Sequence, residues 1–329
     1  MTVQGKVKGK LPKGDPALLN RVAWNSRWSS REKSETYAKA ALRTIGKRPA
    51  PDSRTAFGYA LLTLAWQAKW RGDFDSSMTH SLEAETYLSE AKHPGARAHI
   101  YSILGVLHYS RSRLDLAASS VERGLTLADP DAHTEAYIDL LTTKATVQRY
   151  RGDRPRSGLT LGRARDLAAG AELARLEHNI ARGMMADDVA LSGLKHAKVS
   201  LELCLEHNNR VVIPYAQEVI GACCVALEDF GQAEAAFTSG LDLAIEDNDF
   251  RAQCQIIHRH AALEYAQKKL ERARDLNRFG AQIAKEMNYH LWGRDFALDL
   301  AKIYEELGDL RKSVDAHKCG WGFEKQRRT

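Results

Sequence analysis

Apolar, small and polar positions recur along the chain with a period of about 40 residues. The period is measured from one reference residue in each unit, the residue that follows a predicted turn between two helices. Successive reference residues lie 40, 40, 40, 36, 40 and 40 positions apart. A fixed period of this length predicts a repeat architecture, in which each unit packs on the next. The reference residues are Phe74, Leu114, Arg154, Leu194, Phe230, Leu270 and Leu310.

Three positions in each unit carry small side chains. Three residues after the reference, every unit has alanine or serine: Ser77, Ala117, Ser157, Ala197, Ala233, Ala273 and Ser313. Ten residues after it lie Ala84, Gly124, Ala164, Cys204, Gly240, Gly280 and Gly320. Nine residues before it lie Ala65, Gly105, Ala145, Met185, Gly221, Ala261 and Ala301, where Met185 is the exception. Small side chains at equivalent positions predict three places per unit where helices approach closely.

The turn inside a unit has its own signature. The segments RGDF (71–74), RGDR (151–154) and LGDL (307–310) place glycine where a first helix ends and aspartate where a second helix begins. Glycine adopts the left-handed conformation that ends a helix, and aspartate caps the next helix. Turn residues also separate successive units. Each unit is therefore predicted to be a helix, a short turn and a second helix.

A weaker copy of the pattern lies upstream. With Arg31 as its reference, Ser34 and Ala41 fall on small positions, and its first helix is expected at about 16–27. Terminal repeats are atypical, so we expect this copy to cap the array. The sequence thus predicts a flexible basic tail (1–14), a repeat domain (15–325) and a second tail (326–329). The expected units are 15–48, 54–92, 96–129, 133–170, 172–208, 210–247, 250–288 and 290–325.

The pattern resembles that of the tetratricopeptide repeats. In YSILGVLH, Tyr101, Leu104, Gly105 and His108 follow the first helix of that family, and Phe237 fills the aromatic position of its second helix. The resemblance implies an all-α fold, a right-handed α-solenoid of about seven to eight helix pairs. The family unit has about 34 residues, and the longer units here are similar to the sensor and adaptor regions of bacterial signalling proteins.

Composition agrees with a helical protein. The 329 residues include only eight prolines and 23 glycines, and 44% of them are hydrophobic. No window approaches the length of apolar sequence that a membrane span requires, and the basic N-terminus is not followed by an apolar signal-peptide core. We therefore expect a cytoplasmic protein that does not bind membranes.

The net charge of +6 and the isoelectric point near 9.0 raise the question of nucleic-acid binding. Much of the positive charge lies in the two tails, and the repeat domain is only mildly basic. We do not expect nucleic acid as a partner. The tail cations are Lys6, Lys8, Lys10, Lys13, Lys325, Arg327 and Arg328.

The sequence contains no motif for catalysis or for metal binding. Its five cysteines form no CxxC pair and no cluster with zinc-ligand spacing. Nucleophile-elbow, phosphate-loop and HExxH motifs are all missing. In the segment HRH (258–260), the period places His260 on the packed side and the two preceding residues on the groove side. We predict no enzymatic activity, no cofactor and no metal.

In a solenoid of this kind, a peptide or protein partner binds along the concave groove formed by the first helices. Aromatic and cationic side chains suit a partner with acidic groups or a free carboxylate. The alternative for Trp66 and Trp70 is packing between helices. The predicted groove residues are Tyr59, Trp66, Lys69, Trp70, His99, Tyr109, Arg149, Asn179, Arg182, Tyr215, Glu218, His258, Arg259 and Tyr265.

The function predicted first is a non-enzymatic scaffold or adaptor for a peptide or protein. One alternative is a ligand- or peptide-sensing module of a bacterial signalling protein, placed before a diguanylate cyclase, kinase or DNA-binding output domain. Another is a helical-repeat RNA binder, which the irregular residue types along the groove favour less.

Overall fold

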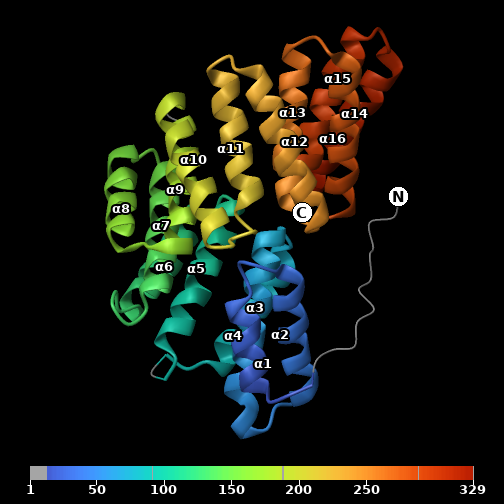
Figure 1. The fold of residues 1–329 in the computed structure, drawn as a ribbon. Helices are drawn as coiled ribbons and strands as arrows, with labels where there is room; N and C mark the ends of the chain where they lie inside the picture. Colours follow the sequence, from blue (N-terminus) through green and yellow to red (C-terminus); the bar gives the residue numbers. More distant parts are fainter. Residues whose placement is uncertain (1–12, 91, 187–188, 288, 329) are drawn as a thin grey trace. The chain divides into compact units, whose positions relative to one another are not determined.

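The structure is a computed structural model that describes residues 13–90, 92–186, 189–287 and 289–328. Its α-helices follow one another in pairs along the chain (Figure 1). These residues contain sixteen α-helices, one 3₁₀ turn and no strand, which confirms the predicted all-α repeat fold. The helices are α1 (Pro16–Asn25), α2 (Arg31–Ile45), α3 (Arg54–Arg71), α4 (Phe74–Tyr87), α5 (Pro94–Ser110), α6 (Leu114–Leu127), α7 (Thr134–Tyr150), α8 (Arg154–Leu167), α9 (Gly170–Ala186), α10 (Ala190–Glu206), α11 (Ile213–Ala226), α12 (Phe230–Glu246), α13 (Phe250–Ala266), α14 (Leu270–Glu286), α15 (His290–Glu306) and α16 (Leu310–Arg328).

Six of the described turns inside pairs share one backbone conformation. In each of them, the residue two positions before the second helix has a positive φ, whether or not it is glycine. Gly72, Gly152 and Gly308 have φ of 86°, 85° and 78°, and Ser112, Glu228 and Lys268 have φ of 59°, 62° and 60°. The left-handed residue stops the first helix and redirects the chain.

Aspartate follows this residue in four of the described turns and caps the second helix. Asp73, Asp153, Asp229 and Asp309 each accept a hydrogen bond from the backbone N–H three residues later, all at 3.1 Å. The Gly-Asp signature read from the sequence therefore has the predicted structural role.

The expected register is wrong in one unit. The second helix there, α10, begins at Ala190 and not at Leu194. Counted from Ala190, the small positions fall on Gly193, Ser200 and Ala181, all of which are buried, so the exception at Met185 disappears. The 36-residue step consequently lies between Arg154 and Ala190. A shift of four residues is close to one helical turn, so both registers put small residues on the same helix face.

The small positions are places of close contact between helices. A Cβ atom added to Gly280 would lie 2.3 Å from the Phe296 ring, and one added to Gly124 would lie 2.4 Å from Leu140. Where serine occupies such a position it is also buried: the hydroxyls of Ser77 and Ser157 each donate to a carbonyl of the preceding helix at 2.8 Å. Larger side chains have no space there.

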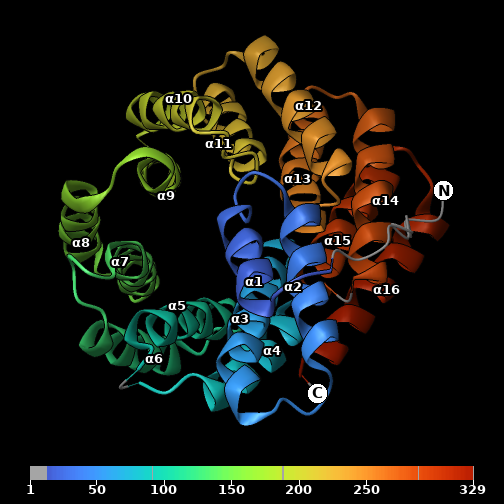
Figure 2. The same cartoon turned by 60° about the horizontal axis from the view of Figure 1, so that its bottom comes forward.

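The chain groups into two compact units. Unit 1 comprises Met1–Lys69 and Asp73–Ala168, and unit 2 comprises Trp70–Gly72 and Ala169–Thr329. Within unit 1, α5 and α7 lie in one layer and α6 and α8 in the other (Figure 2). No helix in the described part of the chain is both long and apolar enough to cross a membrane.

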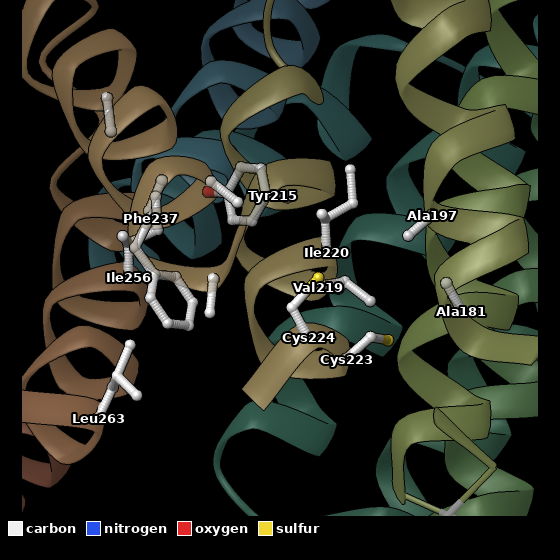
Figure 3. Packing of buried hydrophobic residues seen from close by; sticks show 14 residues of the cluster. Ala181, Ala197, Tyr215, Val219, Ile220, Cys223, Cys224, Phe237, Ile256 and Leu263 are labelled. Atoms are coloured by element: carbon white, nitrogen blue, oxygen red, sulfur yellow. The ribbon is translucent and has the colours of Figure 1, made fainter. Parts of the chain in front are cut away.

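The core of unit 2 is built around α11. Phe237 of α12 lies beside Ile256 of α13, and Cys223 points toward the helices that carry Ala181 and Ala197 (Figure 3). Phe237 is fully buried, and Gly221 leaves the space for its ring, since a Cβ there would lie 2.4 Å away. Burial raises the pKa of the Cys223 thiol to about 12, so this thiol is a packing group.

The predicted limits of the repeat domain stay predictions. Residues 1–12 of the expected tail and Thr329 lie outside the described residues. At the C-terminal end α16 runs to Arg328, past the expected limit at residue 325.

Candidate ligand-binding site

Unit 1 contains a pocket on the side formed by its first helices. It has a volume of about 830 Å³ and is lined by α1, the start of α3 and the starts of α5 and α7. Two of the predicted groove residues line it. Tyr59 is 36% exposed, and His99 is 8% exposed. A pocket of this volume, with an aromatic wall and a few polar groups, is typical of sites for small molecules and peptide segments.

The wall of the pocket is an aromatic and cationic cluster. The Trp24 ring meets the His99 ring edge-on, with centroids 5.0 Å apart. The guanidinium of Arg27 lies 4.1 Å from the Trp24 ring centroid and donates a hydrogen bond to Glu135. Cation–π contact and the ion pair together hold the Trp24 ring in place. The wall is thus ordered by contacts among α1, α5 and α7.

Trp66 and Lys69 do not lie on the groove surface where the sequence places them. Trp66 is fully buried behind Trp24 and Trp28, with ring centroids 5.7 and 5.1 Å away. The Nζ of Lys69 lies 3.8 Å from the Trp66 centroid, and Lys69 is only 6% exposed. Packing between helices, the alternative for Trp66, is what the structure has. Both residues support the wall from inside.

Polar groups surround the opening. Arg21 and Lys92 are exposed lining residues, and the Tyr59 hydroxyl lies 3.5 Å from Nδ1 of His93. Nδ1 of His99 lies 3.5 Å from a carboxylate oxygen of Asp139, which is buried. The opening therefore presents cations and imidazoles together with the exposed carboxylate of Asp52, while the Asp139 carboxylate lies deeper in the protein.

Comparison with known proteins bears on the fold. No family model matches the sequence, and no curated protein matches it. Among solved structures, a Rap protein in complex with competence and sporulation factor is similar with a TM-score of 0.63 and 14% identity, covering 95% of this chain and 98% of that one. The Rap conjugation gene regulator of the plasmid pLS20, in complex with the Phr* peptide, has a TM-score of 0.61 and 14% identity, with 97% of each chain covered.

A third similar structure is a signal transduction ATPase with a tetratricopeptide repeat sensor from Pyrococcus horikoshii. Its TM-score is 0.53 and its identity 16%, over 93% of this chain and 50% of that one. This chain has the tetratricopeptide-type fold. Its helix pairs are therefore tetratricopeptide-type pairs, and the pocket lies on the first helices of the first four.

The remaining predicted residues of unit 1 lie outside the pocket. Tyr109 stacks on Tyr150 of the next first helix, with centroids 5.8 Å apart. Arg149 is half-buried next to Tyr150 in the sequence, and Trp70, which belongs to unit 2, is half-buried near the end of α3. These tetratricopeptide-type first helices therefore do not bring all the predicted side chains together.

In unit 2, predicted groove residues pair with one another or with neighbours. Glu218 accepts hydrogen bonds from Gln255 at 3.0 Å and from Arg259 at 3.2 Å. Burial raises the pKa of Glu218, although Arg259 and Arg182 act in the opposite direction. Glu218 is 2% exposed, so the sequence is wrong to place it on the surface.

Most of the other predicted residues of unit 2 form hydrogen bonds or ion pairs within the protein. Tyr215 is 3% exposed and donates to Asp249 at 3.2 Å, so it too lies inside. The remaining contacts are Arg182 to Asn179 at 3.4 Å, His258 to Asp299 at 3.3 Å, and a hydrogen bond from Tyr265 to Glu306. Whether a partner touches any of these residues stays a prediction.

One cluster in unit 2 has residue types that could hold a metal ion. Glu234, His260 and Glu264 offer ligand atoms within 4.8 Å of one another. However, Arg272 lies 2.8 Å from Glu234 and 3.1 Å from Glu264, and Lys269 lies 3.7 Å from Glu264. The two cations balance the two carboxylates, so we describe this cluster as an intramolecular ion-pair network.

Sequence reasoning missed several pocket residues. Trp24 and Asn20 belong to the atypical first pair, and His93 and His133 precede helices α5 and α7. The repeat period assigns groove positions inside regular first helices, so it gives no signal for a terminal cap or for a loop. A histidine directly before a predicted helix, where a capping residue is expected, was the available signal.

Proposed function

We propose that this chain is a non-enzymatic adaptor that binds a peptide, or a peptide segment of a protein partner, in the unit 1 pocket. The observation that carries the proposal is the pocket itself, with its ordered Trp24 wall and the polar groups of α1, α5 and α7 around its opening. Aromatic walls supply contact area, and polar groups at the rim give orientation.

An acidic group in the peptide is part of this proposal. Arg21, Lys92 and His93 line the pocket, and Glu135, which also lines it, accepts a hydrogen bond from Arg27. The exposed carboxylate of Asp52 also lines the pocket, so it is the cations Arg21 and Lys92, and not a net positive charge of the lining, that favour a ligand with a carboxylate. The structure of the similar pLS20 regulator is a complex with the Phr* peptide, which supports peptides as the first class of ligand to test.

The experiment uses a pool of N-acetylated octapeptides randomised at every position. The purified full-length chain is mixed with the pool, and the retained peptides are separated by gel filtration and identified by mass spectrometry. We expect retained peptides to be enriched in Asp, Glu and free carboxyl ends. Failure to retain any peptide would overturn the proposal.

Charge reversal at the rim tests the location. We expect Arg21→Glu to weaken binding of a retained acidic peptide by about tenfold, because the substitution replaces attraction with repulsion. The matched control is Arg43→Glu, an exposed residue of α2 that does not line the pocket. Equal losses in both variants would show that the site is elsewhere.

The two alternatives gain no support from the described residues. A sensing module and an RNA binder both stay possible uses of a helical-repeat fold, but the pocket geometry favours neither over the adaptor. Cytoplasmic localisation and the lack of enzymatic activity stay predictions.

A further inference from the structure

Helix α16 of unit 2 presents a row of apolar side chains to solvent. Leu310, Val314, His317 and Trp321 follow one another at spacings of four, three and four residues, so they lie on one side of the helix. All four are exposed, Leu310 by 68% and Trp321 by 79%. Single apolar residues are normal on a surface, but several on one helix face are typical of a binding surface. We call these four residues the apolar row.

The same positions are covered in a preceding pair of unit 2. Phe237 and Leu241 of α12 lie two periods before His317 and Trp321. Phe237 is buried and Leu241 is half-buried. The next first helix, α13, covers this side of α12, with its Ile256 beside Phe237 (Figure 3). The apolar row is therefore the surface on which the repeat places another helix.

Cations follow one edge of the apolar row. Arg311, Lys318 and Lys325 are exposed and lie seven residues apart, so they share one side of the helix. Of the acids in α16, Glu324 is half-buried and pairs with an arginine of α15, and Asp315 is exposed. In paired helices, charges beside the apolar row select the partner. This cationic row therefore favours a helix with acidic flanking residues.

The other edge of the apolar row is closed by α15. Ser313 is buried and donates a hydrogen bond to Glu305 of α15 at 3.0 Å. Gly320 is also buried, and a Cβ atom added there would lie 3.6 Å from Ala297 of α15. A partner helix can therefore approach only over the apolar row and the cationic row.

A second copy of this chain is a poor occupant of the surface. In an antiparallel pair of α16 helices, the two cationic rows would face each other, and like charges repel. In a parallel pair, each cationic row would face the edge that α15 closes. Charge and access therefore favour a helix of different sequence.

We infer that α16 binds an acidic amphipathic helix of a partner protein, antiparallel to α16. The helix takes the place that a following first helix takes elsewhere in unit 2. Its apolar side chains pack on the apolar row, and its carboxylates pair with the cationic row. This inference goes beyond the proposed function, because it assigns a second surface, in unit 2, to a second partner.

The test uses two synthetic helices of three heptads, each with leucine at both apolar heptad positions. One has glutamate at both flanking positions and the other has lysine, so neither pairs with itself. We expect the full-length protein to bind the fluorescein-labelled acidic helix about tenfold more tightly than the basic one in fluorescence anisotropy. Equal binding of both helices would overturn the inference. Binding of neither helix would overturn it too, and binding to phosphatidylserine vesicles instead would assign the surface to a membrane.

Charge reversal tests the location. We expect the double variant Arg311→Glu, Lys318→Glu to prefer the basic helix, because its cationic row has become largely acidic. The matched control, Lys195→Glu with Lys198→Glu, reverses two exposed lysines of α10 and should keep the preference for the acidic helix. Arg21→Glu should keep it as well, which separates this surface from the unit 1 pocket. An unchanged preference in the α16 variant would overturn the inference.

Removal of the apolar side chains tests the packing. We expect the double variant Val314→Ser, Trp321→Ser to bind the acidic helix about tenfold more weakly, because it loses apolar contact area. The matched control is Leu159→Ser in α8, where the leucine is 76% exposed. Thermal unfolding checks that both variants stay folded. Undiminished binding by the α16 variant would show that charge alone attracts the helix, and would overturn its docking on the apolar row.

Discussion

Ser112 and Gly152 occupy the same turn position in successive pairs, with φ of 59° and 85°. The left-handed backbone conformation destabilises a residue that has a side chain by about 1 kcal/mol or more, and glycine adopts it without this strain. The turn geometry is therefore conserved between pairs even where the sequence does not favour it. Packing of the two helices on each other offsets the backbone strain at Ser112.

Introducing glycine at position 112 and removing it at position 152 should change stability in opposite directions. We expect Ser112→Gly to raise the free energy of unfolding by about 1 kcal/mol and Gly152→Ala to lower it by about 1 kcal/mol. No atom lies within 4 Å of a Cβ placed on Gly152, so the second effect is backbone strain alone. Urea unfolding of both variants measures the two changes in the free energy of unfolding. A loss of stability in Ser112→Gly would contradict this account of the turn.

Glu218 makes stability depend on pH. Burial raises the pKa of its carboxyl above the ordinary value of 4.5, so the folded protein favours the protonated form. That contribution is complete below pH 4.5 and is lost as pH rises through the raised folded value. We therefore expect Glu218→Gln, which cannot ionise, to lose less stability than the original chain between pH 4.5 and 8. If the free energy of unfolding, measured in urea, fell equally with rising pH in the two proteins, the prediction would be contradicted.

At the scale of the helix, the small positions decide how closely neighbours pack. We expect Gly280→Ala to lower the free energy of unfolding by about 1–3 kcal/mol, because the new methyl group would meet the Phe296 ring. The matched control is Gly162→Ala in α8, where a Cβ meets nothing within 4 Å. There the higher helix propensity of alanine should stabilise the protein by about 1 kcal/mol. Chemical unfolding of both variants gives the comparison, and a neutral Gly280→Ala would show that the ring can move aside.

Repeat spacing also explains what the sequence could and could not predict at this scale. The Gly-Asp turns and the small positions correctly predicted helix pairs and their contacts. The register error at Ala190 arose because deletion of about one helical turn leaves the same faces buried. Trp66 could not be placed from the period alone, since groove and core positions alternate within a single turn of a first helix. Its burial depends on Trp24 and Trp28, which the terminal pair contributes.

At the scale of the whole molecule, buried and half-buried histidines contribute to the response to acid. Burial lowers the pKa of His80, His108, His178 and His260, and that of His178 falls to about 3. The unfolded chain takes up these protons near the ordinary value of 6.5. Stability from the neutral imidazoles is therefore complete above that pH and is lost as the pH falls toward 3.

A single variant can isolate one of these groups. We expect His178→Gln to flatten the pH dependence of unfolding between pH 6.5 and 4, by about 2 kcal/mol at pH 5 relative to the original chain. Urea unfolding across this range measures the difference. An equally steep loss of stability in the variant would assign acid sensitivity to other groups.

The glycine contacts also fix the order of the helix pairs along the chain. Gly280 receives Phe296 and Gly124 receives Leu140, in each case from the following pair, so each notch is shaped for one particular side chain. A shuffled array would set an aromatic ring against a notch made for leucine, or against alanine. Pairs that look interchangeable by period therefore differ in the side chain that each accepts from the next pair. Grafting the unit 1 pocket onto another protein would require neighbouring pairs to be moved together.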